Sequence, residues 1–219
     1  KGELKNIVHG INNEAVDSKD NIIGAASCTT NAIVPVLKVI NDELGIISGH
    51  IETVHAYTND QNLIDNFHVK SRRGRSAALN LVITETGAGT AVGQILPELQ
   101  GKLTANAIRV PTPNVSLAIM KLNLEKSVDV TELNDFLRQT AFHSKYKDQI
   151  DFTNSSEIVS SDFVGNRYAG IIDSAATICN ENHAILYVWY DNEFGYTVQL
   201  LGLAKEMVGL TYQRYPEYQ

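Results

Sequence analysis

The sequence lacks several features that define large classes of protein. No uninterrupted apolar run approaches the roughly 18 residues that a membrane-spanning helix needs. Only two cysteines occur, Cys28 and Cys179, without any Cys-x-x-Cys pair, so neither a disulfide framework nor a zinc site is expected. The 18 Lys+Arg residues are outnumbered by 25 Asp+Glu residues, and the net charge of −7 disfavours nucleic acid as a partner. We therefore expect a soluble, cytoplasmic protein without metal, membrane or nucleic-acid ligands.

Phosphate-binding loops of the familiar kinds are also missing. Neither G-x-G-x-x-G nor G-x-x-x-x-G-K-[ST] occurs among the 219 residues. If the chemistry uses a nucleotide cofactor, most of its binding surface must therefore lie outside this chain. The chain begins at Lys1 without a methionine, and the strand-like residues 6–10 have no earlier strand to pair with. These two features lead us to expect a piece of a longer protein.

The hydrophobic pattern predicts one compact body, since no repeat is visible and the 15 glycines and five prolines are scattered. Helices are expected from Thr30 to Gly45, with Pro35 in the tolerated first turns, and over 86–101, 129–142 and 195–208. Strands are expected at 21–26, 46–57, 105–110, 115–124, 158–161, 167–179 and 184–190. Because strands follow one another more often than they alternate with helices, the pattern favours an α+β fold. We expect a mostly antiparallel or mixed sheet with helices packed on one face.

Cys28 lies where a predicted strand gives way to a predicted helix, so the helix N-terminus can stabilise its thiolate. Lowering the thiol pKa by about two units from ~8.5 requires roughly 2.7 kcal/mol. The helix dipole supplies only ~0.3–1 kcal/mol, or ~2 when partly buried, so a partner cation is needed. His55, near the end of the next strand, is the nearest candidate. The alternative is that Cys28 is a small buried apolar residue, which is how we interpret Cys179.

Hydroxyls and basic residues suggest anion binding. Thr58 and the pair Thr86-Gly87, at the start of a predicted helix, are donors of the kind that hold phosphate. Arg109 stands in an apolar strand, so it either pairs with a carboxylate or points into a site that receives an anion. The irregular stretch 58–76 is long for an unstructured connection and is expected to be a functional or interface loop. Its basic residues are either donors for phosphate or a solvated surface.

Six motifs resemble the phosphorylating glyceraldehyde-3-phosphate dehydrogenases, in the same order over nearly the whole chain. They are Ala26-Ser27-Cys28-Thr29-Thr30-Asn31, His55-Ala56-Tyr57-Thr58-Asn59-Asp60-Gln61, Arg72-Arg73-Gly74-Arg75, Thr86-Gly87-Ala88, Arg109-Val110-Pro111-Thr112 and Trp189-Tyr190-Asp191-Asn192-Glu193-Phe194-Gly195-Tyr196. The resemblance implies an N-terminal Rossmann domain followed by a catalytic domain. It makes residues 1–27 a remnant of the NAD-binding domain, 28–194 the catalytic domain, and 195–219 a terminal helix and tail that normally pack on the NAD-binding domain. It also implies a homotetramer.

The resemblance implies a role for each candidate residue. Cys28 attacks the aldehyde of glyceraldehyde 3-phosphate, and His55 accepts the proton as the thioester forms. Thr58 and Arg109 match the positions that hold the substrate's phosphate. Asn192 and Tyr196 match cofactor-binding positions, with NAD against NADP left open. The positions that receive the inorganic phosphate, which attacks the thioester, are matched by Ser27, Arg73, Thr86 and Gly87. Thr29 is a further substrate-binding position.

Three alternatives and one departure accompany this interpretation. An erythrose-4-phosphate dehydrogenase shares the thiol chemistry but releases a free acid, and Thr58 argues against it. A non-catalytic oligomerisation or interaction fragment is a second alternative, because this chain alone is expected to be inactive while keeping a reactive Cys28. A cysteine hydrolase is less attractive, since no Asn or Asp is placed by sequence to orient His55. Glu85 stands beside Thr86, where the family usually has a neutral residue, and we expect its side chain to point outward.

Overall fold

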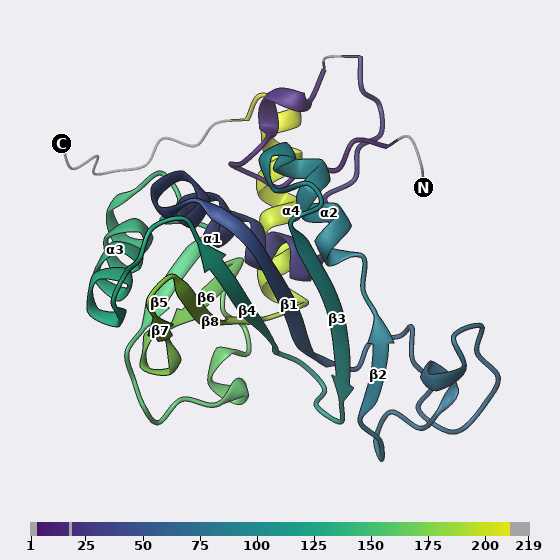
Figure 1. Cartoon of the computed structure of the whole chain (residues 1–219). Helices are drawn as coiled ribbons and strands as arrows, with labels where there is room; N and C mark the ends of the chain where they lie inside the picture. The colour runs from purple at the N-terminus through teal and green to yellow at the C-terminus, as the bar shows by residue number, and fades with distance from the viewer. Residues whose placement is uncertain (1–3, 18, 211–219) are drawn as a thin grey trace.

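The computed structural model describes residues 4–17 and 19–210, and these form an eight-stranded mixed sheet with helices packed against it (Figure 1). The strands are β1 Ile46–Ala56, β2 Val82–Glu85, β3 Leu103–Val110, β4 Ser116–Leu124, β5 Ile150–Thr153, β6 Gly170–Asp173, β7 Ile178–Asn180 and β8 His183–Tyr190. The α-helices are α1 Cys28–Leu44, α2 Ala88–Ile95, α3 Val130–His143 and α4 Phe194–Met207. Short 3₁₀ turns are η1 Asn13–Ala15, η2 Ser71–Gly74, η3 Pro97–Leu99, η4 Ser160–Phe163 and η5 Ser174–Ala176.

The strand order is β2-β3-β1-β4-β8-β6-β5, with β7 also paired to β8. The β1–β3 and β5–β6 pairs are parallel and the others are antiparallel. Helix α1 contacts β1, β4, β5, β6 and β8, while α2 packs on β3 and α3 on β5. Along β4 and β8 every second side chain is buried, which is the period-2 pattern of a sheet with one face covered. The predicted α+β fold is confirmed.

Helix α1 carries the centre of the core and begins at Cys28, two residues before the predicted start. Ser27 is its N-cap, since the Ser27 hydroxyl accepts a hydrogen bond of 3.0 Å from the Thr30 backbone N–H. Ile33, Leu37 and Ile40 are fully buried at helical spacing. Gly45 ends the helix with a positive φ of 68°, as predicted. Cys28 is thereby fixed at the first helical position.

Several local predictions are wrong. Pro35 lies inside α1 rather than in its first turns, because the helix begins earlier than predicted. Residues 21–26 form no strand and contribute only one parallel bridge, between Gly24 and Asn6, which also gives the first strand-like segment its partner. Helix α2 ends at Ile95 instead of running to Gly101, since Pro97 cannot continue the hydrogen-bond ladder.

The remaining predictions that differ from the structure lie mostly in the second half of the chain. Residues 158–161 are not a strand, and η4 begins at Ser160 instead. The single strand predicted over 167–179 is broken by η5 into β6 and β7. The short strands β2 and β5 were not predicted; both have four residues and lie at the edges of the sheet order. The other strands and helices follow the predictions to within a few residues.

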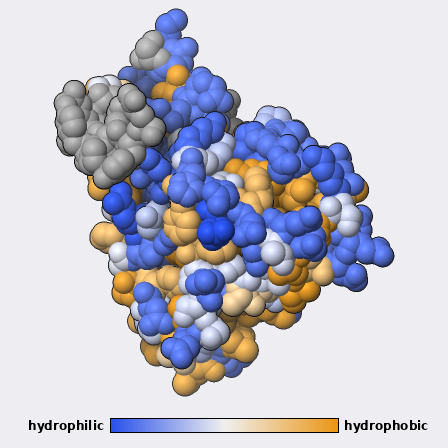
Figure 2. Space-filling model, turned by 90° about the vertical axis from the view of Figure 1, so that its left-hand side faces the viewer, coloured by the Kyte–Doolittle hydropathy of each residue, from blue (hydrophilic) through white to orange (hydrophobic). Residues whose placement is uncertain are grey.

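The two ends of the sheet differ in what surrounds them. The segment 58–85 projects beyond β3 on the β2 side (Figure 1). At the opposite side of the molecule, which carries α3, apolar residues reach the surface only in separate patches between polar ones (Figure 2). Within 4–17 and 19–210, none of the helices combines the length and apolarity needed to cross a bilayer.

Candidate functional site

The fold brings Cys28 and His55 together. Cys28 opens α1 and His55 is the next-to-last residue of β1, on the face that α1 covers. The Cys28 Sγ atom lies 3.7 Å from His55 Nε2, which is within hydrogen-bond distance for sulfur. Cys28 is partly buried, and the His55 ring is 5% exposed. The two predicted catalytic side chains therefore form one site, 27 positions apart in sequence.

Burial, more than charge, sets the ionisation of this pair. Loss of solvent raises the pKa of the Cys28 thiol, although the Thr29 backbone N–H, the Thr29 hydroxyl and the Arg109 charge oppose this. Burial also lowers the pKa of His55 to about 4, helped by the nearby Arg109 guanidinium and opposed by a hydrogen bond to the Ala56 carbonyl. Burial therefore opposes the expected ion pair of a thiolate with a histidinium, and it favours a thiol beside a neutral imidazole, which can act as the base for the thiol.

A cluster of hydroxyl groups lies behind the pair and was missed by the sequence analysis. The Tyr190 hydroxyl lies 2.8 Å from Thr29 Oγ1 and 2.7 Å from Thr53 Oγ1. Its ring meets the His55 ring edge to face, with 6.0 Å between centroids. Burial raises the pKa of Tyr190, so the group stays a neutral phenol. Thr29, predicted as a substrate contact, therefore connects the thiol to a fixed hydroxyl cluster.

Arg109 points into the same site from β3. Its Nη1 atom lies 2.8 Å from His55 Nδ1, 3.0 Å from the Ala56 carbonyl oxygen and 3.3 Å from Thr58 Oγ1. Within 4–17 and 19–210, no carboxylate lies at ion-pair distance from Arg109, and its buried Nε atom has no hydrogen-bond partner. Arg109 was expected either to pair with a carboxylate or to point into a site that receives an anion. The structure supports the anion site, because a partly buried guanidinium without a counter-charge is costly.

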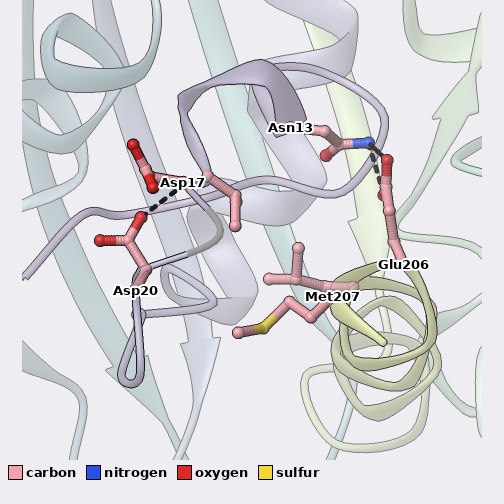
Figure 3. Close-up of a pocket in the computed structure, with 7 residues that line it drawn as sticks. Asn13, Asp17, Asp20, Glu206 and Met207 are labelled. Carbon is pink, nitrogen blue, oxygen red and sulfur yellow. Dashed lines mark hydrogen bonds between the residues drawn. The ribbon is translucent and has the colours of Figure 1, made fainter. Parts of the chain in front are cut away.

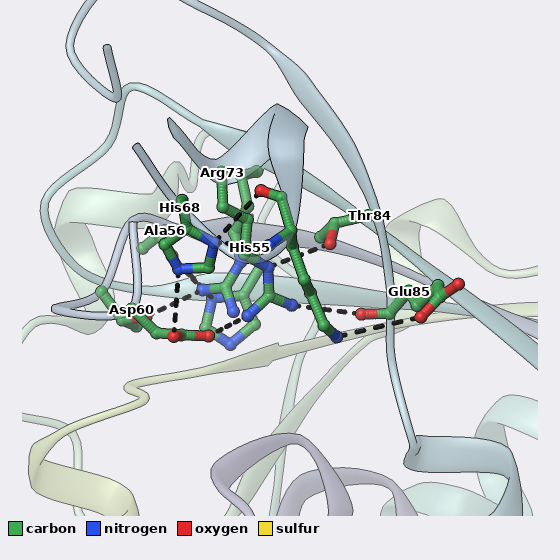
Figure 4. Close-up of polar contacts among 10 residues, drawn as sticks. His55, Ala56, Asp60, His68, Arg73, Thr84 and Glu85 are labelled. Atoms are coloured by element: carbon green, nitrogen blue, oxygen red, sulfur yellow. Dashed lines mark hydrogen bonds and ion pairs between the residues drawn. The ribbon is translucent and has the colours of Figure 1, made fainter. Parts of the chain in front are cut away.

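Arg73 is held differently, by a network that crosses the 58–85 segment (Figure 4). The Arg73 guanidinium pairs with the Asp60 carboxylate and donates to Thr84 Oγ1 at 2.9 Å and the Glu85 carbonyl at 3.2 Å. His68 Nε2 lies 3.5 Å from the other Asp60 oxygen. Arg73 is 7% exposed and already has a counter-ion, so it differs in kind from Arg109. The Glu85 side chain is 92% exposed and lies near Lys70, which confirms that it points outward.

A separate cleft joins the starts of the first two helices. It is lined by Leu4, Asn6, Gly24, Ala26, Ser27, Thr30, Thr86, Gly87, Ala88 and Ala91. The cleft therefore brings Ser27 together with Thr86 and Gly87, as predicted, but Arg73 does not line it. Thr86 Oγ1 accepts a hydrogen bond of 3.3 Å from the Ala88 backbone N–H at the start of α2. Two helix N-termini and their hydroxyls thus border one cleft, an arrangement suited to an anion.

Asn192 and Tyr196 lie where β8 passes into α4. Asn192 is 7% exposed, and its Oδ1 atom accepts a hydrogen bond of 3.1 Å from the Ser116 hydroxyl. Ser116 also accepts from the Ala56 backbone N–H, so one buried hydroxyl connects Asn192 to the strand that carries His55. The Tyr196 hydroxyl donates to the Ala26 carbonyl at 3.5 Å, close to Cys28. Tyr196 thus lies beside the thiol, and Asn192 is connected through Ser116 to the end of β1.

Asp191 fixes this junction and was not predicted. Its two carboxylate oxygens accept hydrogen bonds of 2.7–3.0 Å from the backbone N–H groups of Gly165, Glu193 and Phe194 and from Asn114 Nδ2. The residue is 1% exposed. Burial alone would raise the pKa of Asp191, but these hydrogen bonds together lower it. The ionised carboxylate therefore determines how α4 begins beside Asn192.

We expect Asp191→Asn to destabilise the chain by about 2–4 kcal/mol at neutral pH, because an amide cannot accept all four hydrogen bonds. A folded-state pKa below the unfolded value gives stability that is present above the unfolded pKa and lost as the pH falls through the folded pKa. The difference between the two proteins should therefore shrink below about pH 4. Urea unfolding from pH 3 to 7 measures it. Asp135→Asn, on the exposed face of α3, is the matched control, and equal losses in both variants would contradict this role for Asp191.

A second pocket lies between the N-terminal segment and α4 (Figure 3). Its lining residues are Asn13, Val16, Asp17, Asp20, Leu203, Glu206 and Met207. Asn13 Nδ2 donates to both oxygens of Glu206, and His9 Nδ1 lies 3.1 Å from one of them. Helix α4 therefore contacts residues before Cys28, in the segment interpreted above as a remnant of a cofactor domain. No predicted site residue lies here, and within the described ranges no three His, Cys, Asp or Glu side chains gather as a metal site.

The fold places a thiol–imidazole pair beside an unpaired guanidinium, and comparison with known sequences shows the family of the chain. The profile described as "Glyceraldehyde 3-phosphate dehydrogenase, C-terminal domain" matches residues 27–192, and the chain belongs to this family. A glyceraldehyde-3-phosphate dehydrogenase-like protein of Pseudomonas aeruginosa is 63% identical over 216 residues, which cover 99% of this chain and 47% of that protein. The glyceraldehyde-3-phosphate dehydrogenase of Borreliella burgdorferi is 43% identical over 95% of this chain and 62% of its own length. The glyceraldehyde-3-phosphate dehydrogenase of Mycobacterium leprae is 45% identical over 90% of this chain and 58% of its own length. The chain thus spans about half to three fifths of these relatives.

Proposed function

We propose that this chain is the catalytic part of an NAD-dependent, phosphorylating glyceraldehyde-3-phosphate dehydrogenase, which converts glyceraldehyde 3-phosphate and inorganic phosphate to 1,3-bisphosphoglycerate. The observation that carries the proposal is the thiol–imidazole pair at 3.7 Å with Arg109 and Thr58 beside it. Family membership and the relatives' names support it. The proposal includes residues 1–27 as a remnant of the NAD-binding domain, 28–194 as the catalytic domain, and 195–219 as a terminal helix and tail that pack on the NAD-binding domain.

The residues of this chain have distinct tasks in that reaction. Cys28 Sγ attacks the aldehyde carbon while His55 Nε2 takes the thiol proton and passes it to the former carbonyl oxygen, giving a hemithioacetal and a neutral His55. His55 accepts the hydroxyl proton when the hemithioacetal is oxidised to a thioester. Inorganic phosphate then attacks the thioester carbon and the Cys28 thiolate leaves. Arg109 and Thr58 hold the phosphate of the substrate, and the cleft of Ser27, Thr86 and Gly87 holds the attacking phosphate.

The residues near the thiol fit a nicotinamide cofactor. Asn192 offers an amide whose oxygen is already held by Ser116, and within the described part of the chain its Nδ2 group has no hydrogen-bond partner. A carboxamide is a suitable partner for that donor. When bound, NAD or NADP would accept the hydride that leaves the hemithioacetal carbon. Most of its binding surface is expected in the N-terminal part of the longer protein, since no dinucleotide loop occurs here.

A homotetramer in the cytoplasm completes the proposal. Apolar side chains on the 58–85 segment are exposed by 56–90%, namely Leu63, Ile64, Phe67, Val69, Leu79, Leu81 and Ile83. Such a concentration on one projecting segment is typical of a protein–protein contact. It supports a subunit interface, and it equally suits the alternative in which this chain acts only as an interaction fragment. Activity distinguishes the two.

The test is reduction of NAD by the full-length protein with glyceraldehyde 3-phosphate and inorganic phosphate. We expect turnover that depends on phosphate, and slower turnover with erythrose 4-phosphate. The 219-residue chain alone should be inactive. Preference for erythrose 4-phosphate with release of a free acid would support the second dehydrogenase instead, and no turnover with either aldehyde would leave only the interaction fragment.

A further inference from the structure

A short segment before Cys28, residues 6–13, lies against helix α4 and is here called the strap. Its first part belongs to the fold, since Ile7 and Val8 are buried and the Ile7 N–H donates to the Gly24 carbonyl at 2.8 Å. Its second part meets α4, where a Cβ atom on Gly202 would lie 2.7 Å from the His9 ring. A side chain at this position of the helix would not fit. The strap and α4 are therefore in direct packing contact.

Glu206, one helical turn after Gly202, makes the polar contacts with the strap (Figure 3). Asn13 Nδ2 donates to its two carboxylate oxygens at 2.7 and 2.6 Å, and His9 Nδ1 lies 3.1 Å from one of them. The Gly10 backbone N–H donates to Asn13 Oδ1 at 3.0 Å, which fixes the orientation of the Asn13 amide with its NH₂ group toward the carboxylate. Because a carboxylate only accepts, His9 Nδ1 carries a proton in this contact. Donors and acceptors between the strap and Glu206 thus match.

The strap is also tied to the sheet through Gln149. This residue is buried, and its Nε2 atom donates to the His9 carbonyl oxygen at 3.4 Å. Gly10, with a φ of 77°, lies so close that a Cβ atom on it would be 2.4 Å from the same Nε2 atom. The Gln149 carbonyl accepts from the backbone N–H groups of Ala169 and Gly170, at the start of β6. A continuous path of contacts therefore joins α4 through His9 and Gln149 to the sheet.

Helix α4 needs such a contact to keep its direction. Three of its 14 residues are buried, namely Gly195, Gln199 and Leu203. Its first turn carries Tyr196, whose hydroxyl donates to the Ala26 carbonyl at 3.5 Å. Glu206 follows ten residues later, about 15 Å further along the helix axis at about 1.5 Å per residue. Contacts near both ends fix the axis of a helix, whereas contacts near one end let it tilt.

We propose that His9, Asn13 and Glu206 form a latch that positions α4 and thereby keeps Tyr196 beside Ala26, without any domain that precedes this chain. In this proposal the strap folds together with the catalytic part. Glu206 lies at the far end of α4 from Tyr196, so it is a positioning residue and not a catalytic one. The proposal concerns the placement of α4 and does not depend on the proposed dehydrogenase activity.

Hydrogen exchange of the 219-residue chain, measured by mass spectrometry of its peptides, tests the latch. We expect Glu206→Ala to lower the protection of α4 amides about tenfold, because it removes hydrogen bonds to a charged acceptor, and to leave α3 unchanged. The helix dipole alone predicts the opposite sign, since it favours removal of a negative charge from a C-terminal turn. Glu43→Ala is the matched control, because Glu43 is exposed in the last turn of α1. Unchanged protection of α4 in Glu206→Ala, or an equal loss in α3, overturns the proposal.

Gly202→Ala tests the packing of the strap without touching Glu206. Alanine is the better helix former, which by itself would raise the protection of α4 amides about fivefold. In the structure the new Cβ atom meets the His9 ring, so we expect the protection of α4 to fall instead. Higher protection in Gly202→Ala contradicts the contact between the strap and α4.

Alkylation of Cys28 by iodoacetamide shows whether the latch acts on Tyr196. Burial and the charge of Cys28 raise the pKa of Tyr196, so its ring lies near the thiol. We expect Glu206→Ala and Tyr196→Phe each to speed alkylation about threefold, and the double variant to be no faster than Tyr196→Phe. Effects that multiply in the double variant contradict the positioning of Tyr196 by Glu206. Because neither measurement needs cofactor or turnover, failure here is distinct from failure of the dehydrogenase assay.

Discussion

Replacing Cys28 with serine is expected to reduce phosphate-dependent NAD reduction by the full-length protein by about 10⁴-fold or more. Removing a covalent nucleophile abolishes the chemical step rather than substrate binding, so the loss belongs to kcat. Serine cannot replace the thiol here, because its hydroxyl is far less acidic and a neutral His55 is a weak base for it. The assay follows NADH formation with glyceraldehyde 3-phosphate and phosphate at pH 7.

Cys179→Ser is the matched control for this experiment. Cys179 lies in the edge strand β7, where burial and the charge of Asp129 raise the pKa of its thiol. We expect this variant to keep its activity and to lose no alkylation at Cys28. Alkylation of the chain with iodoacetamide between pH 6 and 8 distinguishes two states of Cys28: a rate above that of a free peptide thiol shows that His55 takes the thiol proton, and a lower rate shows a buried thiol with a raised pKa. Equal rates of NADH formation by Cys28→Ser and the unchanged protein would end the proposal of a thioester mechanism.

The sequence was enough to predict which side chains meet, but not their protonation. The distance of 27 residues between Cys28 and His55 is bridged by one helix and one strand, whose lengths follow from the hydrophobic period and from Gly45. The thiol pKa depends on how much water reaches the sulfur, and burial by elements distant in sequence cannot be inferred from local pattern. This is why the helix terminus, although predicted, does not lower the pKa as expected.

The hydroxyl-bearing residues behind the thiol–imidazole pair could not be predicted from the sequence for a related reason. Tyr190, Thr53 and Ser116 come from three strands, and each in isolation is an ordinary sheet residue. Only the antiparallel register of β4 with β1 and β8 brings their hydroxyls behind the site. Asp191 could have been noticed, since an aspartate just before a helix start is a common capping residue. Short edge strands such as β2 carry too few residues for a period-2 pattern to be recognised.

Acidification between pH 6.5 and 4 is expected to lower the free energy of unfolding through His55. The pKa of His55 is about 4 in the folded chain against an ordinary value of 6.5, because the ring is buried and faces Arg109. A lowered folded-state pKa means that the unfolded chain binds the proton more tightly, so stability is lost as the pH falls through this window. The difference of about 2.5 units corresponds to roughly 3 kcal/mol at full protonation of the unfolded state.

His55→Asn should remove this part of the pH dependence, whatever it does to stability at pH 7. The measurement is the midpoint and slope of urea unfolding at half-unit steps from pH 4 to 7.5 for the unchanged chain, His55→Asn and His183→Asn. His183 is exposed at the start of β8, so its replacement should leave the pH dependence nearly unchanged. If His55→Asn and the unchanged chain lose stability in parallel as the pH falls, the imidazole is not the buried neutral group described here. The thiol would then need another base.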